Sequence, residues 1–236
     1  MSRYAVHQQN LIGRDFVVGD IHGCFSRLAQ MLDGIGFDES KDRLFSVGDL
    51  VDRGPESDQC LAWLNKPWFH AVRGNHEEMI VEAYLRGGDK DISFANGGAW
   101  IYGLPDVEAQ CYAALFDDLP FAMEVTAGKL RFGLVHAECP MGDWDWFKAA
   151  LEQPADGSMA AASLEAAALW ARTRISHEDR SKISGVDFVV VGHTPQEHPR
   201  CLGNVIYLDT GACFGRPLSM LCLNTMTLYA ESRVNA

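Results

Sequence analysis

Five short apolar segments of this chain end at a polar side chain that can bind metal, and this feature most restricts its fold. The five junctions are Phe16–Val18 before Gly19-Asp20-Ile21-His22, Leu44–Val47 before Gly48-Asp49, Phe69–Val72 before Arg73-Gly74-Asn75, Leu130–Val135 before His136, and Val186–Val191 before Gly192-His193. Short runs of β-branched and aromatic residues predict buried strands. Loops at the carboxyl ends of such strands gather distant residues into one site. We therefore expect Asp20, His22, Asp49, Asn75, His136 and His193 to converge.

Helical patterns between the strands predict a layered α/β (α+β) fold. Apolar residues at helical spacing predict one helix from about residue 25 to 35, and further helices are expected at 58–64 and 77–85. The stretches 90–122 and 140–182 read as helical segments, which either cap a sheet edge or pack as ordinary helices. Two late strands, Val205–Leu208 and Met220–Leu223, have no helix between them and predict antiparallel pairing. The 236 residues favour one domain spanning 1–236.

The six converging residues offer carboxylate, amide and imidazole ligands, which suit borderline divalent metals. Six protein ligands exceed the three that one catalytic zinc uses, so two ions that share a carboxylate fit better. Each residue alone has a plainer interpretation. A Gly-Asp pair is usually a turn, and Asn75 alone would be a helix cap. Four of the eight histidines fall within these strand-end motifs, and the joint pattern favours a metal site.

The acidic balance of the chain restricts its partners. Its formal net charge is -12, which disfavours binding to nucleic acid or to an anionic membrane. A phosphorylated substrate would also be repelled unless metal ions and arginines supply local positive charge. The seven cysteines have no zinc-finger spacing, and Cys24 and Cys139 are expected to pack rather than to react. With no signal peptide or membrane span apparent, we expect a cytoplasmic monomer.

The strand-end motifs resemble those of the calcineurin-like metallophosphoesterase superfamily. Gly48-Asp49-Leu50-Val51-Asp52-Arg53-Gly54 and Arg73-Gly74-Asn75-His76-Glu77 are similar to motifs of its serine/threonine phosphoprotein phosphatases. Asn96-Gly97-Gly98, Leu169-Trp170-Ala171-Arg172 and Asp209-Thr210-Gly211-Ala212 resemble the small bacterial and bacteriophage lambda-type enzymes. This resemblance implies a β-sandwich flanked by helices, with a binuclear metal site at the carboxyl ends of strands. Glu138 departs from the family pattern at a position that binds no metal.

The resemblance also implies a role for each site residue. Asp20 and His22 would hold one divalent ion, and Asn75, His136 and His193 a second, with Asp49 bridging both. We expect manganese foremost, with iron, zinc or nickel as alternatives. A hydroxide that bridges the ions would attack phosphorus. His76 is the expected general acid, oriented by Asp52, and the alternative for His76 is a seventh metal ligand. Arg53, Arg73 and Arg172 are the expected phosphate-binding residues, with Arg174 as a rival to Arg172.

Three functions are compatible with these motifs. The first is a metal-dependent phosphomonoester hydrolase that acts on phosphorylated proteins at serine and threonine. The second is a symmetrical dinucleoside tetraphosphate hydrolase, which shares the metal motifs, although Asp52 and the pair His76-Glu77 favour the first. The third is a metal-binding regulatory module without catalysis. The intact set of Asp52, Arg53, Arg73 and His76 argues against it, because metal binding alone would not require these residues.

Overall fold

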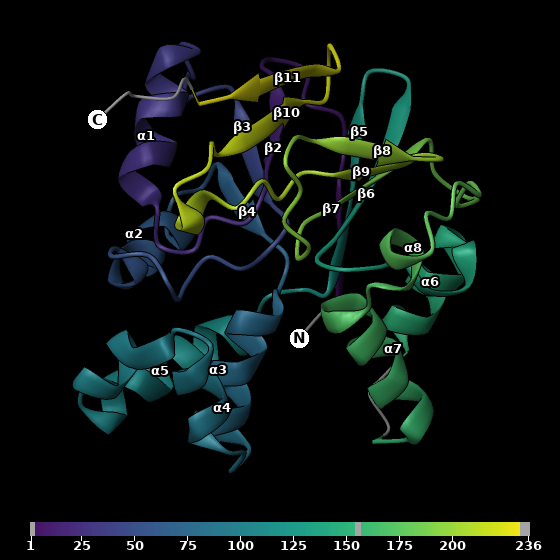
Figure 1. The fold of residues 1–236 in the computed structure, drawn as a ribbon. Helices are drawn as coiled ribbons and strands as arrows, with labels where there is room; N and C mark the ends of the chain where they lie inside the picture. The colour runs from purple at the N-terminus through teal and green to yellow at the C-terminus, as the bar shows by residue number, and fades with distance from the viewer. Residues whose placement is uncertain (1–2, 154–156, 232–236) are drawn as a thin grey trace.

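Two mixed β-sheets pack face to face in the computed structural model, which describes residues 3–153 and 157–231 (Figure 1). One sheet has the order β1-β5-β6-β7-β9-β8, and the other has the order β11-β10-β2-β3-β4. The first comprises β1 (Tyr4–His7), β5 (Ala122–Ala127), β6 (Leu130–Val135), β7 (Phe188–Val191), β9 (Val205–Tyr207) and β8 (Arg200–Leu202). The second comprises β11 (Thr227–Ala230), β10 (Ser219–Cys222), β2 (Asp15–Val18), β3 (Arg43–Ser46) and β4 (Phe69–Ala71).

Alternation along the central strands divides the core into three layers. Val17 of β2, Phe45 of β3 and Val190 of β7 lie between the two sheets. Their neighbours Phe16 and Val18 face the opposite side of the five-stranded sheet. Because successive side chains of a strand point to opposite faces, a strand covered on both faces must be apolar throughout. This double burial explains why the strands are continuous apolar runs.

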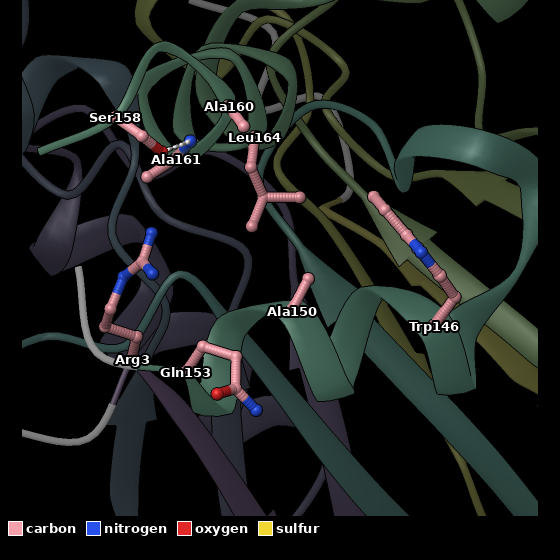
Figure 2. Close-up of a pocket in the computed structure, with 8 residues that line it drawn as sticks. All are labelled: Arg3, Trp146, Ala150, Gln153, Ser158, Ala160, Ala161 and Leu164. Atoms are coloured by element: carbon pink, nitrogen blue, oxygen red, sulfur yellow. Dashed lines mark hydrogen bonds between the residues drawn. The ribbon is translucent and has the colours of Figure 1, made fainter. Parts of the chain in front are cut away.

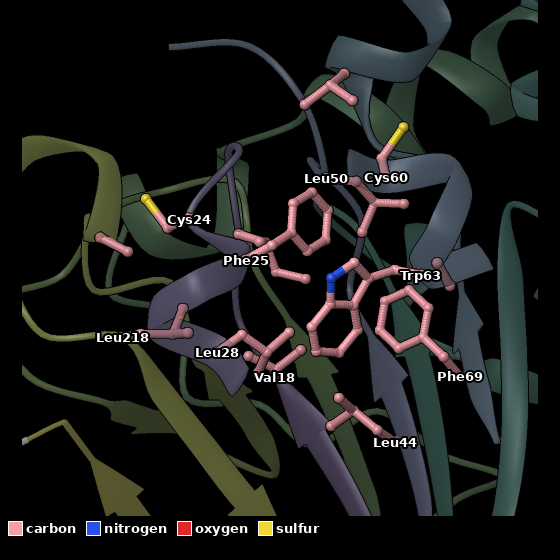
Figure 3. Packing of buried hydrophobic residues seen from close by; sticks show 14 of the residues in the cluster. Val18, Cys24, Phe25, Leu28, Leu44, Leu50, Cys60, Trp63, Phe69 and Leu218 are labelled. Carbon is pink, nitrogen blue, oxygen red and sulfur yellow. The ribbon is translucent and has the colours of Figure 1, made fainter. Parts of the chain in front are cut away.

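Helices cover the outer face of each sheet. Phe25 and Leu28 of α1 (Phe25–Gly34) and Trp63 of α2 (Cys60–Leu64) pack on the five-stranded sheet, as Figure 3 shows. Trp144 and Phe147 of α6 (Trp144–Glu152) lie in the cluster that covers the six-stranded sheet, together with residues of α7 (Met159–Trp170). The predicted sandwich flanked by helices is confirmed.

Two helical groups extend from the same end of the sandwich (Figure 1). One comprises α3 (Asn75–Leu85), α4 (Lys90–Ala95) and α5 (Asp106–Asp117), and the other comprises α6, α7 and α8 (Thr173–Ser176). Short 3-10 helices occur at 57–59, 98–103, 140–142 and 212–214. The helical character expected for 90–122 and 140–182 is therefore present, apart from residues 154–156, which lie outside the described part. Because α6 and α7 bury residues against a sheet, they belong to the packed core.

The structure departs from the sequence-based expectations in its strands. β1, β5, β8 and β11 have no counterpart among the predicted strands. β9 and β10 each have an antiparallel partner, but they do not pair with each other because they belong to different sheets: β9 pairs with β8, and β10 pairs with β2 and β11. The predicted antiparallel arrangement is correct, and the implied mutual pairing is wrong.

Candidate metal centre

The loops that follow β2, β3, β4, β6 and β7 bring the six expected ligands to one buried region. Asp20, His22, Asp49, Asn75, His136 and His193 are each at most 5% exposed. Among the described residues, eight that are not glycine adopt a positive φ, and five of them are site candidates: His22, Asp49, Asp52, Arg53 and His193. Non-glycine residues avoid this conformation because the Cβ clashes with the backbone. Its concentration here indicates that the packing of the loops holds these side chains in place.

Glycines permit the close approach of these loops. A Cβ at Gly192 would lie 2.0 Å from Oδ1 of Asp20, and one at Gly74 would lie 2.3 Å from the backbone nitrogen of Asp49. Both distances are too short for any other residue type at these positions. Gly192, which precedes His193, and Gly74, which precedes Asn75, are therefore required by the close contact between loops.

His136, His193, Asn75 and Asp49 form one group of facing electron-pair donors. Nδ1 of His136 donates to the carbonyl of Val47 at 2.8 Å, so its Nε2 carries the lone pair. That Nε2 lies 2.9 Å from Oδ1 of Asn75, 3.2 Å from Nδ1 of His193 and 3.3 Å from Oδ1 of Asp49. His193 is held in the same way, with its Nε2 3.3 Å from the carbonyl of Trp170, which leaves the Nδ1 lone pair toward the group.

His22, Asp49 and His76 form the second group, and the carboxylate of Asp49 belongs to both. Nδ1 of His22 donates to the carbonyl of Val51 at 2.8 Å, and its Nε2 lies 3.5 Å from Oδ2 of Asp49. Asp20 is not in either group of three found among the described residues; its carboxylate accepts the backbone N–H of His193 at 3.0 Å. The central position predicted for Asp49 thus has a direct geometric counterpart, whereas Asp20 lies at the margin.

This donor set fits divalent metal ions. Burial lowers the pKa of both His22 and His193 to about 3, and it also lowers the pKa of His136, so the three imidazoles are neutral. Neutral imidazoles, an amide oxygen and a carboxylate facing one another at about 3 Å repel unless a cation lies among them. Backbone carbonyls fix the tautomers that metal binding requires.

His76 is held beside this cluster by a buried hydrogen-bond chain. Its Nδ1 lies 2.7 Å from Oδ2 of Asp52, and the indole N–H of Trp100 donates to Oδ1 of Asp52 at 2.7 Å. Nε2 of His76 is buried without a hydrogen-bond partner among the described residues, 3.9 Å from Oδ2 of Asp49. Burial alone would lower the pKa of His76, but Asp49 and Asp52 raise it above its ordinary value. The group can therefore hold a proton at Nε2 next to the cluster.

The four candidate arginines separate into two kinds. Arg53 is exposed, and its Nη1 lies 2.7 Å from Nε2 of His22. Arg172 is also exposed, and its charge contributes to the lowered pKa of His136 and His193, after the larger effect of burial. Arg53 and Arg172 are therefore the two candidate arginines that are exposed.

Arg73 and Arg174 are instead buried, and their guanidinium groups form hydrogen bonds within the fold. Nη1 of Arg73 donates to Glu78 at 2.7 Å, its Nη2 donates to the carbonyl of Asp117, and its guanidinium lies 4.6 Å from the centre of the Phe121 ring. Both terminal nitrogens of Arg73 are thus engaged in the fold, and its expected role as a phosphate ligand stays a prediction that these contacts do not favour. Arg174 is buried and donates to the carbonyls of Asp179 and Ser181, which favours Arg172 over it as the phosphate ligand.

Three further residues support the cluster and were not identified as site residues from the sequence. Glu77 is fully buried and accepts the backbone N–H groups of Asp49, Leu50 and Gly74 at 2.8–2.9 Å, which fixes the loop that carries Asp49. Burial, followed by the charge of Asp49, raises the pKa of Glu77 to about 7. Asp209 is buried beside Asp20, and the indole N–H of Trp100 donates to the carboxylate of Asp52. In the sequence, the only indication of these supporting roles was that the three residues lie inside or next to the motifs quoted above.

Comparison with known proteins agrees with this geometry. A family model described as calcineurin-like phosphoesterase matches residues 16–197. The chain belongs to this family. Its matched region contains all the residues of the donor cluster. The phosphoesterase relatives include serine/threonine-protein phosphatase 1 of Salmonella typhimurium, 40% identical over 87% of this chain and 89% of the relative. Serine/threonine-protein phosphatase 2 of Escherichia coli is 35% identical over 84% of this chain and 87% of the relative.

Solved structures show the same fold at lower identity. A putative diadenosine tetraphosphatase superposes with a TM-score of 0.66 at 23% identity and covers 98% of this phosphoesterase chain and 99% of its own. Within the described residues, no helix is long and apolar enough to cross a membrane.

Proposed function

We propose that this phosphoesterase removes phosphate from phosphorylated serine and threonine residues of proteins. The support is the identity of 33–40% to bacterial serine/threonine-protein phosphatases over most of the chain. The observation that carries the chemistry is the pair of donor groups that share Asp49, one of which includes His76, whose other ring nitrogen is paired with Asp52. A regulatory module that only binds metal would not need that histidine–aspartate pair.

Two divalent ions, manganese foremost, would be held by Asp20, His22 and Asp49 on one side and by Asp49, Asn75, His136 and His193 on the other. When bound, such ions supply an activated water and charge that stabilises the phosphoryl transition state. Asp49 would serve both ions. Its loop is held in place by Glu77.

His76 would donate its Nε2 proton to the departing alkoxide of serine or threonine. Asp52 keeps the ring oriented through Nδ1, and the charges of Asp49 and Asp52 raise the pKa of His76, which favours its protonated form. Arg53 and Arg172 would bind phosphate oxygens through their guanidinium groups. The net charge of the chain is -12, which would repel a phosphorylated substrate. The positive charge of the two arginines and of the metal ions would offset this repulsion at the site. Arg73 is left out of this role because its terminal nitrogens bind Glu78 and Asp117.

Substitution of the neighbouring arginines should separate phosphate binding from folding. Arg172→Ala should lower kcat/KM for a phosphoserine peptide by about 10- to 100-fold, since a charge-assisted contact to phosphate is lost. Arg174→Ala should instead lower the free energy of unfolding, because it leaves the carbonyls of Asp179 and Ser181 without their donor. Steady-state kinetics and thermal unfolding measured on both variants check this. An Arg172→Ala enzyme with unchanged kinetics would remove Arg172 from the site.

Substrate choice is the direct test of the proposed function. With Mn²⁺ present, kcat/KM for a phosphoserine or phosphothreonine peptide should exceed kcat/KM for diadenosine tetraphosphate by at least about tenfold. The dinucleotide is the relevant competitor because symmetrical bis(5'-nucleosyl)-tetraphosphatases match part of the chain, for example at 33% identity over 55% of it. A preference for the dinucleotide would reverse the proposal.

We also propose a cytoplasmic monomer that binds neither nucleic acid nor membrane. The acidic charge supports the absence of such partners. The seven cysteines are all unpaired, and Cys24 and Cys139 are buried in the apolar clusters, as expected for packing residues in a reducing compartment. Light scattering and fractionation of cells test these two points.

A further inference from the structure

Phe214 is an exposed aromatic residue beside the candidate site. It ends the 3-10 helix Ala212–Phe214, which follows β9, and 60% of its surface is exposed. The guanidinium carbon of Arg53 lies 5.5 Å from the centre of the Phe214 ring. Nη1 of the same guanidinium lies 2.7 Å from Nε2 of His22. Arg53 thus connects the exposed ring to the buried donor cluster.

The loop that carries Phe214 is anchored on both sides. The guanidinium of Arg27 donates to the carbonyls of Ala212 and Arg216 at 2.6 Å each, and Arg27 is itself paired with Glu231. Gly211 and Gly215 flank the short helix with φ of 78° and 75°, a conformation that favours glycine. The ring is consequently presented by a braced turn. A contact surface that is already ordered loses little entropy when a ligand binds.

The position of Phe214 determines what it can contact. A phosphate bound by Arg53 must direct its organic group away from the buried cluster and toward the surface, where the ring of Phe214 is open. A second exposed aromatic, Trp170, 40% exposed, lies at the other end of the cluster with its ring 6.3 Å from that of His193. The ring of Phe214, by contrast, faces Arg53, a candidate phosphate-binding arginine.

We propose that Phe214 is a specificity-determining residue that stacks against the organic group of the phosphoester, so that aryl phosphoesters bind to this site in addition to the alkyl esters of serine and threonine, and more tightly than small alkyl groups do. This inference rests on the proposed function, because it places phosphate at Arg53. Aromatic pairs contribute beyond the apolar area that they bury, which a small alkyl group cannot match. The role concerns the binding of the organic group and leaves the transfer of phosphate to the cluster.

The test compares three ligands that are not hydrolysed: benzylphosphonate, ethylphosphonate and inorganic phosphate. Binding to the Mn²⁺-loaded protein is measured by titration calorimetry, and inhibition of phosphoserine-peptide hydrolysis provides a second readout. The wild-type protein should bind benzylphosphonate about fivefold more tightly than ethylphosphonate. Phe214→Ala should reduce this ratio to about one with the Kd for inorganic phosphate unchanged, and Phe214→Tyr should keep the ratio. The matched control is Trp146→Ala, which should keep the ratio of the wild type. Trp146 is an exposed aromatic residue of α6 and lines the cavity of about 210 Å³ in Figure 2.

Three outcomes would overturn the inference. A ratio near one in the wild type, or a ratio that survives Phe214→Ala, shows that the ring does not contact the organic group. A loss of affinity for inorganic phosphate as large as that for benzylphosphonate shows that Phe214 only holds Arg53 in place. Failure of the proposed function looks different: the peptide is not hydrolysed by the wild type, whereas calorimetry still reports the ratio.

Discussion

Replacing Asp49 by alanine should deprive the protein of both divalent ions and lower kcat by more than about 10³-fold, a factor that one electrostatic contact alone can supply. The physical reason is that Asp49 is the residue shared by the two donor groups. Its Oδ1 lies 3.3 Å from Nε2 of His136, and its Oδ2 lies 3.5 Å from Nε2 of His22. Metal content per chain, measured by mass spectrometry after gel filtration in Mn²⁺, should fall from two to near zero.

The Asp49 experiment needs a control for folding, because Oδ1 also accepts the backbone N–H of His76. Asp49→Asn keeps the shape of the side chain, and Asp118→Ala removes an exposed aspartate at the end of α5. The asparagine variant should unfold at a temperature close to that of the wild type when both lack metal, yet bind metal poorly. Two retained ions in Asp49→Ala would contradict the bridging position.

Replacing His76 by asparagine should lower kcat for a phosphoserine peptide by roughly 10²–10⁴-fold, the usual contribution of general acid–base catalysis. The two ions should remain bound, because His76 acts as a proton donor in the proposed mechanism. Asparagine cannot transfer a proton at the position of Nε2, although it can still contact Asp52. Rate and metal content are measured on the same preparation.

The His76 result distinguishes an acid from a seventh ligand, the alternative raised by its grouping with His22 and Asp49. Loss of one ion from His76→Asn would assign His76 to the metal centre. An ester with a better leaving group needs less protonation, so the variant should lose less rate on p-nitrophenyl phosphate than on the peptide. His198→Asn, at an exposed histidine, serves as the matched control.

Much of the fold and of the candidate site could be predicted because both depend on local patterns. Apolar runs covered on both faces, such as Phe16–Val18, indicate strands without knowledge of their neighbours. The carboxyl ends of parallel strands such as β2, β3 and β4 meet at one edge of the sheet, so the residues that follow them had to come together. β1 and β11 escaped prediction because they are edge strands with exposed residues and weak apolar patterns.

The roles of the arginines could not be predicted, because they depend on what surrounds each guanidinium. Arg73 stands in a family motif, yet Glu78 and Asp117 bind it only once α3 and α5 have packed together. Arg172 and Arg174 are two residues apart and differ completely in burial. Glu77 and Trp100 likewise reveal their supporting contacts only in three dimensions.

The sequence by itself determined the kinds of side chain available and the strand ends that carry them, since strand formation and glycine turns are local properties. Only the tertiary structure decided which lone pairs face one another, which arginines remain exposed and which aromatic ring lies at the surface. Those outcomes depend on contacts between loops far apart in the chain, such as Asp49 with His136 and Phe214 with Arg53.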